Sequence, residues 1–147
     1  MKQLIVSLAA LAMVIGLCVP AEAANDKSGV LKASSLIGKK IESTDGKKLG
    51  DIKDLVIDPE TGNIQYAVLD FGGFLGFRDK YFAVPWDALE LSADRTIRLD
   101  VSKKDLKQAP GFDKNNWPDL GSPEQIVIIY EFYQVPLPDD MEKQKGQ

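Results

Sequence analysis

Histidine is absent from the 147-residue sequence, and cysteine occurs once, as Cys18. Imidazole is a frequent general base and metal ligand, and thiolates supply nucleophiles, zinc ligands and disulfides. Cys18 lies in an N-terminal apolar run that we expect to be removed. The absences therefore exclude histidine or cysteine catalysis, disulfide bonds and the usual zinc and haem sites from the mature chain.

The sequence also lacks an excess of positive charge: it has 18 Lys and Arg against 22 Asp and Glu, a net charge of −4. This balance argues against nonspecific binding to nucleic acid, whose phosphates attract basic surfaces. Carboxylate pairs such as Asp51 with Asp54 could in principle hydrolyse a glycoside, but no nucleophile, phosphate-binding or metal-binding motif accompanies them. We predict that the protein is not an enzyme and uses no cofactor or metal.

The N-terminus has the order of an export signal. Lys2 precedes an apolar run over residues 4–19, Pro20 ends the run, and residues 21–23 (AEA) offer the small side chains that a signal peptidase reads. The run is shorter than the roughly 20 residues of a relaxed membrane span. We expect cleavage between Ala23 and Ala24, export to the periplasm or medium, and no stable transmembrane anchor afterwards.

Two other fates of this segment are alternatives. An uncleaved signal would remain as an anchor. A lipoprotein signal would make Cys18 the lipidated residue, but Leu17 stands where such a signal needs Gly or Ala.

Short segments with strand patterns, separated by turn signals, fill the middle of the chain. The expected strands are residues 37–43, 49–58, 64–71, 81–84, 86–91 and 96–101. The apolar residues of the second strand change phase near Asp54, which predicts a β-bulge. Residues 64–71 are apolar on both faces, as is typical of a strand in the middle of a sheet or barrel.

Two turns join the first three strands. Residues 44–47 contain an Asp-Gly pair, and residues 58–63 contain Pro59 and Gly62, all typical of hairpin turns. The acidic side chains of the second turn also suggest a calcium loop, but their spacing departs from the EF-hand pattern. We interpret both segments as plain turns.

Helix signals follow the strands. Ser102 and Asp105 form a capping box for residues 103–108, and Ser122 caps a second helix that continues over residues 126–133. Those last residues are strand-like by propensity, but the cap favours a helix. Trp86 and Trp117 stand near prolines, and we expect each to cover an edge of the core.

Residues 72–76 (GGFLG) and 79–86 (DKYFAVPW) together resemble the signature of the PRC-barrel domain family. Residues 33–38 (ASSLIG), 50–55 (GDIKDL), 99–102 (LDVS), 112–113 (FD) and 116–118 (NWP) agree with it in order. The resemblance covers about residues 32–119 and implies a mainly β fold: a small, strongly bent antiparallel β-barrel with short C-terminal helices. It also implies docking or assembly rather than catalysis, and many similar members are small exported bacterial proteins.

These patterns divide the chain into five parts. They are a signal peptide (1–23), a flexible lead (24–32), the PRC-barrel domain (33–119), a C-terminal helical extension (120–138) and a tail (139–147). The tail is charged and has no evident apolar anchor, so we predict that it is disordered.

The candidate partner-contact site is the loop 72–77, where Phe74, Leu75 and Phe77 stand among three glycines. These side chains either fold back to plug the mouth of the barrel or form an exposed patch that contacts a partner protein or a membrane. We predict a protein-interaction or assembly module whose partner is another envelope protein. The alternative is a binding domain for a lipid or an apolar small molecule.

The export signal predicts the N-terminal residue of the exported protein. We expect the exported protein to begin at Ala24, because residues 21–23 present the cleavage site. N-terminal sequencing or intact-mass measurement of the protein recovered after expression of the whole gene tests this. A recovered chain that begins at Met1 would contradict the prediction.

Overall fold

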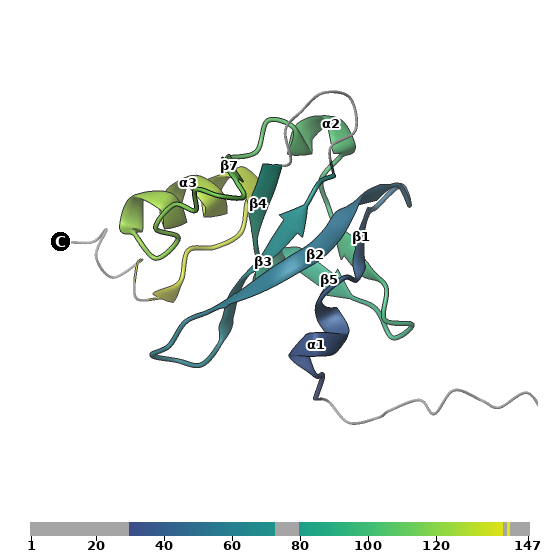
Figure 1. Cartoon of the computed structure of the whole chain (residues 1–147), viewed down its shortest axis with the longest axis horizontal. Coiled ribbons are helices and arrows are strands. Elements are labelled where there is room, and N and C mark those ends of the chain that lie inside the picture. Colours follow the sequence, from purple (N-terminus) through teal and green to yellow (C-terminus); the bar gives the residue numbers. More distant parts are fainter. Residues whose placement is uncertain (1–29, 73–79, 140, 142–147) are drawn as a thin grey trace, which may run out of the picture.

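The computed structural model describes residues 30–72, 80–139 and 141. Within these residues the chain forms one seven-stranded sheet with short helices (Figure 1). The strands are β1 (Lys40–Ser43), β2 (Lys48–Ile57), β3 (Ile64–Asp70), β4 (Lys80–Pro85), β5 (Leu89–Leu91), β6 (Ile97–Leu99) and β7 (Gly111–Asp113). The helices are α1 (Ala33–Leu36), the 3-10 helix η1 (Trp86–Ala88), α2 (Lys103–Leu106) and α3 (Pro123–Tyr133). The predicted mainly β class is confirmed.

Strands β1 to β4 form an antiparallel meander, and the sequence predicted its first two turns. Gly46 and Gly62 take φ angles of +76° and +74° in the first two turns, a region that favours glycine. In the second turn the Asp58 carboxylate accepts hydrogen bonds from Glu60 N and the Thr61 hydroxyl, at 2.8 and 2.7 Å. These bonds lower the pKa of Asp58, with the Thr61 hydroxyl contributing most. The carboxylate that suggested a calcium loop therefore stabilises a plain turn.

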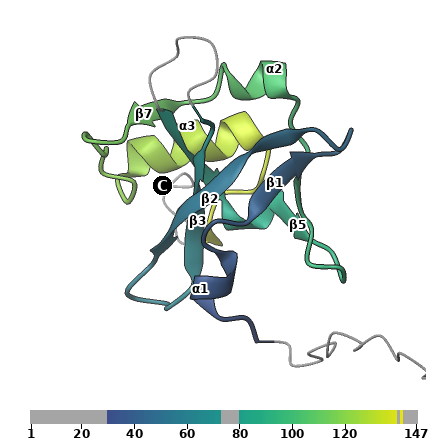
Figure 2. The same ribbon diagram turned by 45° about the vertical axis from the view of Figure 1, so that its right-hand side comes forward.

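The bulge predicted in β2 is present. The register between β2 and β3 shifts between Ile52 and Asp54, where the apolar phase of the sequence changes. A bulge bends its strand and increases the local twist. The long β2 is accordingly bent and lies diagonally across the molecule (Figures 1 and 2).

Strand β3 occupies the interior of the sheet, between β2 and β4. Tyr66, Ala67, Val68 and Leu69 are all inaccessible to solvent, although neighbours along a strand face opposite sides. Helix α3 lies beside β4, and its Tyr130 packs edge-on against Tyr66 with ring centroids 6.0 Å apart. The prediction that this strand is buried on both faces is confirmed.

Helices α2 and α3 begin at the capping residues that the sequence predicted. Ser102 Oγ accepts from Asp105 N and donates to Asp105 Oδ2, and Ser122 Oγ accepts from Gln125 N. In α3 the buried residues are Ile126, Ile129, Tyr130 and Tyr133, the i, i+3, i+4, i+7 spacing of one helix face. The strand-like propensity of this segment is therefore overridden by its cap and by packing.

The antiparallel closed barrel expected from the sequence is not what the described residues form. The strand order is β5-β6-β1-β2-β3-β4-β7, and no described ladder joins β5 to β7, so closure is not confirmed. The pair β1–β6 is parallel, so the antiparallel prediction is wrong for this pair. The cause is the β5–β6 hairpin, which places β6 beside β1 in the same direction.

Three local predictions are also corrected. Residues 33–36 form α1, so the first strand begins at Lys40 rather than at residue 37. Residues 86–88 form η1 before β5 begins. Residues 111–113, for which we expected no strand, form the edge strand β7, which pairs with β4. Elements of three or four residues are too short to give a periodic signal.

The tail has an apolar anchor that the sequence analysis missed. Met141 is buried within the core cluster, and its backbone N donates to Pro138 O at 2.9 Å. The prediction that residues 139–147 carry no apolar anchor is therefore wrong at Met141. A single methionine among charged residues gives no pattern by which its burial could be predicted.

The two tryptophans lie at edges of the core. Trp86 is partly buried and packs against the core cluster. Trp117 is 41% exposed and packs on Tyr81 and Phe112, with ring centroids 6.1 and 5.2 Å apart. Each tryptophan covers an edge, as predicted.

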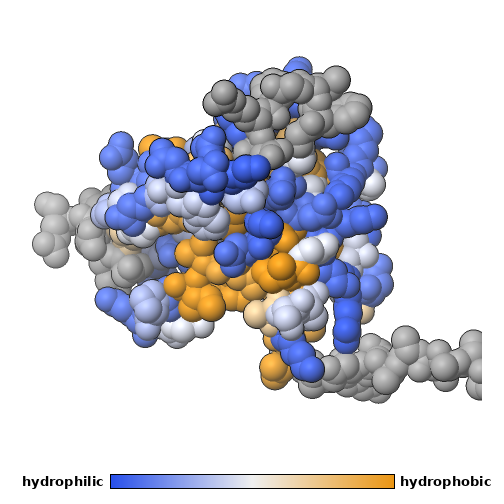
Figure 3. Space-filling view, in the orientation of Figure 1, coloured by the Kyte–Doolittle hydropathy of each residue, from blue (hydrophilic) through white to orange (hydrophobic). Residues whose placement is uncertain are grey.

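Some large apolar side chains remain exposed on the described surface. They are Val30, Leu31, Ile37, Ile57, Leu91, Trp117 and Ile128. Figure 3 shows apolar side chains gathered in the middle of one face, over part of β2 and β3 and beside α1.

Because β2 approaches β3 closely at Gly50, we predict that this position tolerates no side chain larger than that of glycine. A Cβ at this position would lie 2.2 Å from Asp70 O and 2.7 Å from Leu69 Cδ1. We expect Gly50→Ala to lower the free energy of unfolding by about 2 kcal/mol, because such overpacking forces backbone to move. Urea unfolding measures this difference.

Gly121 provides the matched control, since a Cβ there would first meet Asp119 Oδ1 at an ordinary 3.5 Å. Gly121→Ala is expected to change the free energy of unfolding by less than about 0.5 kcal/mol. Equal effects of the two substitutions would contradict the packing argument.

Candidate functional site

The residues singled out as sites in the sequence lie outside the described residues. This holds for Phe74, Leu75 and Phe77 of the candidate contact loop, and for the cleavage site Ala23 and Ala24. The described chain stops at Gly72, whose backbone N donates to Asp70 Oδ1 at 2.9 Å. This contact lies at the end of the sheet at which β3 ends, where described residues form the candidate site.

Parallel pairing of β1 with β6 brings distant segments together at this end. Ser43 and Leu99 are the last residues in register, so the segments that follow both strands leave the sheet side by side. The Thr44 hydroxyl donates to Asp100 Oδ1 at 3.4 Å across a separation of 56 residues. Helix α2 follows directly, and Figures 1 and 2 both show it at this end of the molecule.

Two open hollows flank α2. The acidic hollow has a volume of about 800 Å³ and is lined by Ser43, Thr44, Asp45, Asp100, Val101, Ser102, Asp105, Phe132, Tyr133 and Gln134. The mixed-charge hollow has a volume of about 510 Å³ and is lined by Lys48, Leu49, Gly50, Asp51, Asp70, Phe71, Gly72 and Lys103.

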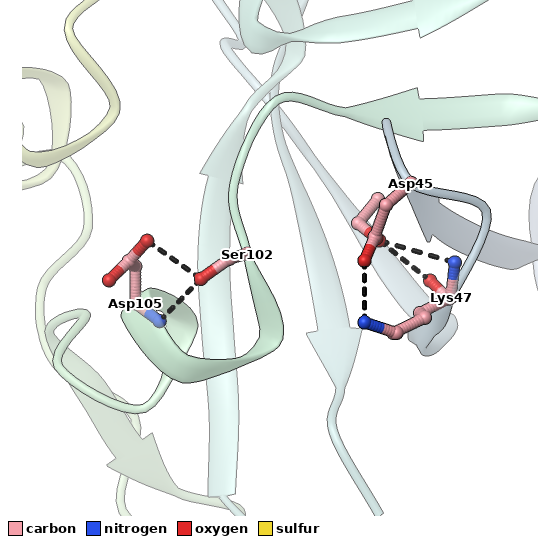
Figure 4. A network of polar contacts seen from close by, with 5 residues as sticks. Asp45, Lys47, Ser102 and Asp105 are labelled. Carbon is pink, nitrogen blue, oxygen red and sulfur yellow. Dashed lines mark hydrogen bonds and ion pairs between the residues drawn. The ribbon is translucent and has the colours of Figure 1, made fainter.

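Asp45 in the acidic hollow is already paired. Its Oδ2 lies 2.7 Å from Lys47 Nζ, and the hydroxyl of the buried Ser43 donates to its Oδ1 (Figure 4). The hydrogen bond from Lys47, and then that from Ser43, lower the pKa of Asp45 to about 2. The same contact raises the pKa of Lys47. Asp45 thus stays ionised and holds the β1–β2 turn in shape.

Asp100 and Asp105 have only hydroxyl donors in the described structure. Asp100 accepts from Thr44, and Asp105 Oδ2 accepts from Ser102 Oγ at 2.7 Å (Figure 4). Both residues are exposed, and neither has an ion pair with a described basic residue. The acidic hollow therefore presents two carboxylates that form no ion pair with any described basic residue.

An aromatic wall from the end of α3 bounds the acidic hollow. Phe132 and Tyr133 contact each other edge-on, with ring centroids 4.9 Å apart. The Tyr133 hydroxyl is buried without a hydrogen-bond partner among the described residues, and its burial raises its pKa. Carboxylates beside aromatic faces are suited to binding a cationic group.

The mixed-charge hollow is internally balanced by contrast. Lys48 Nζ lies 2.6 Å from Asp51 Oδ2, and Lys103 Nζ lies 5.6 Å from the centre of the Phe71 ring. Phe71 in turn packs edge-on against Phe82, with centroids 5.9 Å apart. These contacts fix α2 against the end of β3, so this hollow is mainly structural.

The described residues bring together no group of three or more Asp, Glu, His or Cys that could hold a metal ion. Across the same residues, no helix has the length and hydropathy needed to cross a membrane. What this end of the sheet offers chemically is charge and hydrogen-bonding capacity at an open surface.

Sequence reasoning missed the acidic hollow. The Asp-Gly turn and the Ser102 cap were recognised as local structure, but nothing local links Asp45 with Asp100 and Asp105. Their proximity depends on the parallel β1–β6 pair, for which the sequence carries no signal.

Comparison with known proteins gives two matches. A family model described as the PRC-barrel domain matches residues 28–106, which include β1 to β6 and α2. An uncharacterized protein of Deinococcus radiodurans is 34% identical over 69 residues, which are 47% of this chain and 24% of the relative. The chain thus matches about a quarter of the length of that relative. Helix α3, which supplies the aromatic wall, lies outside the family match.

The ion pair between Asp45 and Lys47 predicts how the pKa of Asp45 responds to removal of the lysine. We expect Lys47→Gln to raise the pKa of Asp45 from about 2 towards its ordinary value of 3.8, because the largest cause of the depression is removed. The stabilisation from this carboxylate is present above about pH 4 and is lost as the pH falls through about 2, and the variant loses the part of this pH dependence that Lys47 contributes. The carboxyl carbon shift of Asp45, followed by NMR against pH, measures the change.

Lys48→Gln is the control, because it removes a nearby lysine that is paired with Asp51 instead. It should leave the titration of Asp45 unaltered. A Lys47→Gln protein in which Asp45 titrates as in the wild type would refute the assignment.

Proposed function

The chain belongs to the PRC-barrel domain family, and on this premise we propose that it is a non-catalytic protein-interaction or assembly module, exported to the periplasm or cell envelope. The fold of this family is generally non-catalytic. Absence of histidine, and of cysteine after residue 18, is consistent with this proposal. Export is supported by the order of Lys2, the apolar run and the small residues at 21–23.

The acidic hollow is the observation that carries the interaction role. Asp100 and Asp105, which form no ion pair with a described basic residue, lie beside Phe132 in a hollow open to solvent. A Lys or Arg side chain of a partner protein would pair with these carboxylates and lie against the ring. Complementary charges of this kind speed association and select among partners.

A lipid or an apolar small molecule is a less suitable ligand for this end of the sheet. Pockets for such ligands are concave and mainly apolar, with only a few polar groups. Both hollows are open, and each is lined by several charged side chains. The lining of the acidic hollow favours a protein partner that carries basic residues.

Neutralising the acidic hollow tests the proposal. We expect the double variant Asp100→Asn, Asp105→Asn to weaken binding of the partner by at least about 1 kcal/mol, because each lost carboxylate removes an ionic contact. Affinity capture from an envelope extract, quantified by mass spectrometry, identifies the partner. Titration of the purified pair at two salt concentrations then measures the affinity.

Asp87→Asn with Glu90→Gln is the matched control, since it removes the same charge from exposed positions outside the hollow. The control should bind as the wild type does, and wild-type binding should weaken as salt rises. Equal binding by the double variant and the control would contradict a role for the acidic hollow.

A further inference from the structure

A second candidate surface surrounds α1, at the opposite end of the molecule from α2. Figures 1 and 2 show α1 at one end and α2 at the other. Val30, Leu31 and Ile37 flank α1 and are 76%, 37% and 42% exposed. Apolar side chains continue from α1 over the neighbouring part of β2 and β3 (Figure 3). Clustered exposure of this kind usually marks an interaction surface.

This apolar surface is accompanied by positive charge, although the chain as a whole is acidic. Lys32, Lys39 and Lys40 are exposed, and no acidic residue occurs from Val30 to Ile41. The net charge of the whole chain is −4. Exposed apolar side chains and positive charge therefore occur together around α1, although the chain as a whole is acidic.

Backbone hydrogen bonds hold the basic segment beside β2. Gly38 N donates to Ile52 O at 2.7 Å, and Ile52 N donates to Lys39 O at 2.8 Å. The acidic residues of β2 near this point are Asp51, which pairs with Lys48, and Asp54, whose Oδ1 accepts from Leu55 N.

The neighbouring stretch of β2 does not make the charge around α1 negative. In this stretch the exposed Lys53 lies between Asp51 and Asp54. Residues 30–41 and 50–55 together carry four lysines and two carboxylates. One of these carboxylates, Asp51, lies opposite Lys40 in the strand register and is paired with Lys48. The local charge remains positive.

We propose that the α1 surface, formed by Val30, Leu31, Lys32, Ile37, Lys39 and Lys40, docks on an anionic phospholipid bilayer. Apolar side chains of such a surface enter the boundary between head groups and acyl chains. Lysine stems lie along that boundary while their ammonium groups reach lipid phosphates. This surface is separate from the acidic hollow and does not depend on the function proposed for it.

The place at which the chain enters the described structure supports a membrane as the occupant. Residues 1–29 lead directly into Val30, and they contain the apolar run 4–19. Before the predicted cleavage after Ala23 that run lies in the membrane, so the α1 surface is the first described part of the chain beside the bilayer during export. A docked α1 surface also leaves α2 directed away from the lipid.

Vesicle partitioning tests the proposal with the protein recovered after expression of the whole gene. We expect sedimentation with phosphatidylglycerol–phosphatidylethanolamine vesicles at low salt, and far less with phosphatidylcholine vesicles. Each Lys→Gln change at Lys32, Lys39 or Lys40 should lower the anionic partition coefficient about fivefold. The pair Leu31→Ser, Ile37→Ser should lower it about tenfold.

Ile128→Ser is the matched apolar control, because Ile128 is equally exposed on α3. Lys104→Gln at α2 is the matched charge control. Both should partition as the wild type does, and unchanged urea midpoints show that each variant remains folded. Similar partitioning into anionic and neutral vesicles, or variants of the α1 surface that behave like the controls, would overturn the proposal. Binding to an acidic protein without binding to vesicles would also overturn it and would assign the surface to a protein.

Discussion

Burial of β3 on both faces is the constraint around which the rest of the molecule is arranged. A strand with apolar side chains on each side is stable only when both faces are covered. Helix α3 covers Tyr66 through Tyr130, and Ala67 and Leu69, which point to the other face, also lie within the core cluster. Each large side chain that is fully buried in this way contributes about 1.5–3 kcal/mol. The cap at Ser122 and the packing of the buried face of α3 together keep its residues helical, and so keep this cover in place.

Polar groups at the α2 end act in two ways. Ser43 and Lys47 hold Asp45 in the β1–β2 turn, and Ser102 both caps α2 and bonds Asp105. Because these bonds orient the side chains, the carboxylates of the hollow are preorganised before a partner arrives. Preorganisation lowers the entropy lost on binding. The same contacts that stabilise the fold therefore prepare its charged surface.

Local features of this fold could be predicted from the sequence because their causes are local. The turns depend on Gly46 and Gly62, the bulge on the phase change near Asp54, and the caps on Ser102 and Ser122. Features produced by contacts between distant segments could not be predicted. These are the parallel β1–β6 pair, the edge strand β7, and the burial of Met141. The acidic hollow belongs with them, whereas the loop that the sequence proposed as a site lies outside the described residues.

The parallel β1–β6 pair also bears on the order in which this chain can fold. A chain that emerges N-terminus first presents Ile41 well before Ile97, its partner in register. Until β6 arrives, β1 can pair only with β2 and keeps an unsatisfied edge. Contacts between residues this far apart slow folding, because the intervening chain must be ordered first. The acidic hollow therefore assembles late, and a partner that recognises it would bind only chains whose sheet is complete.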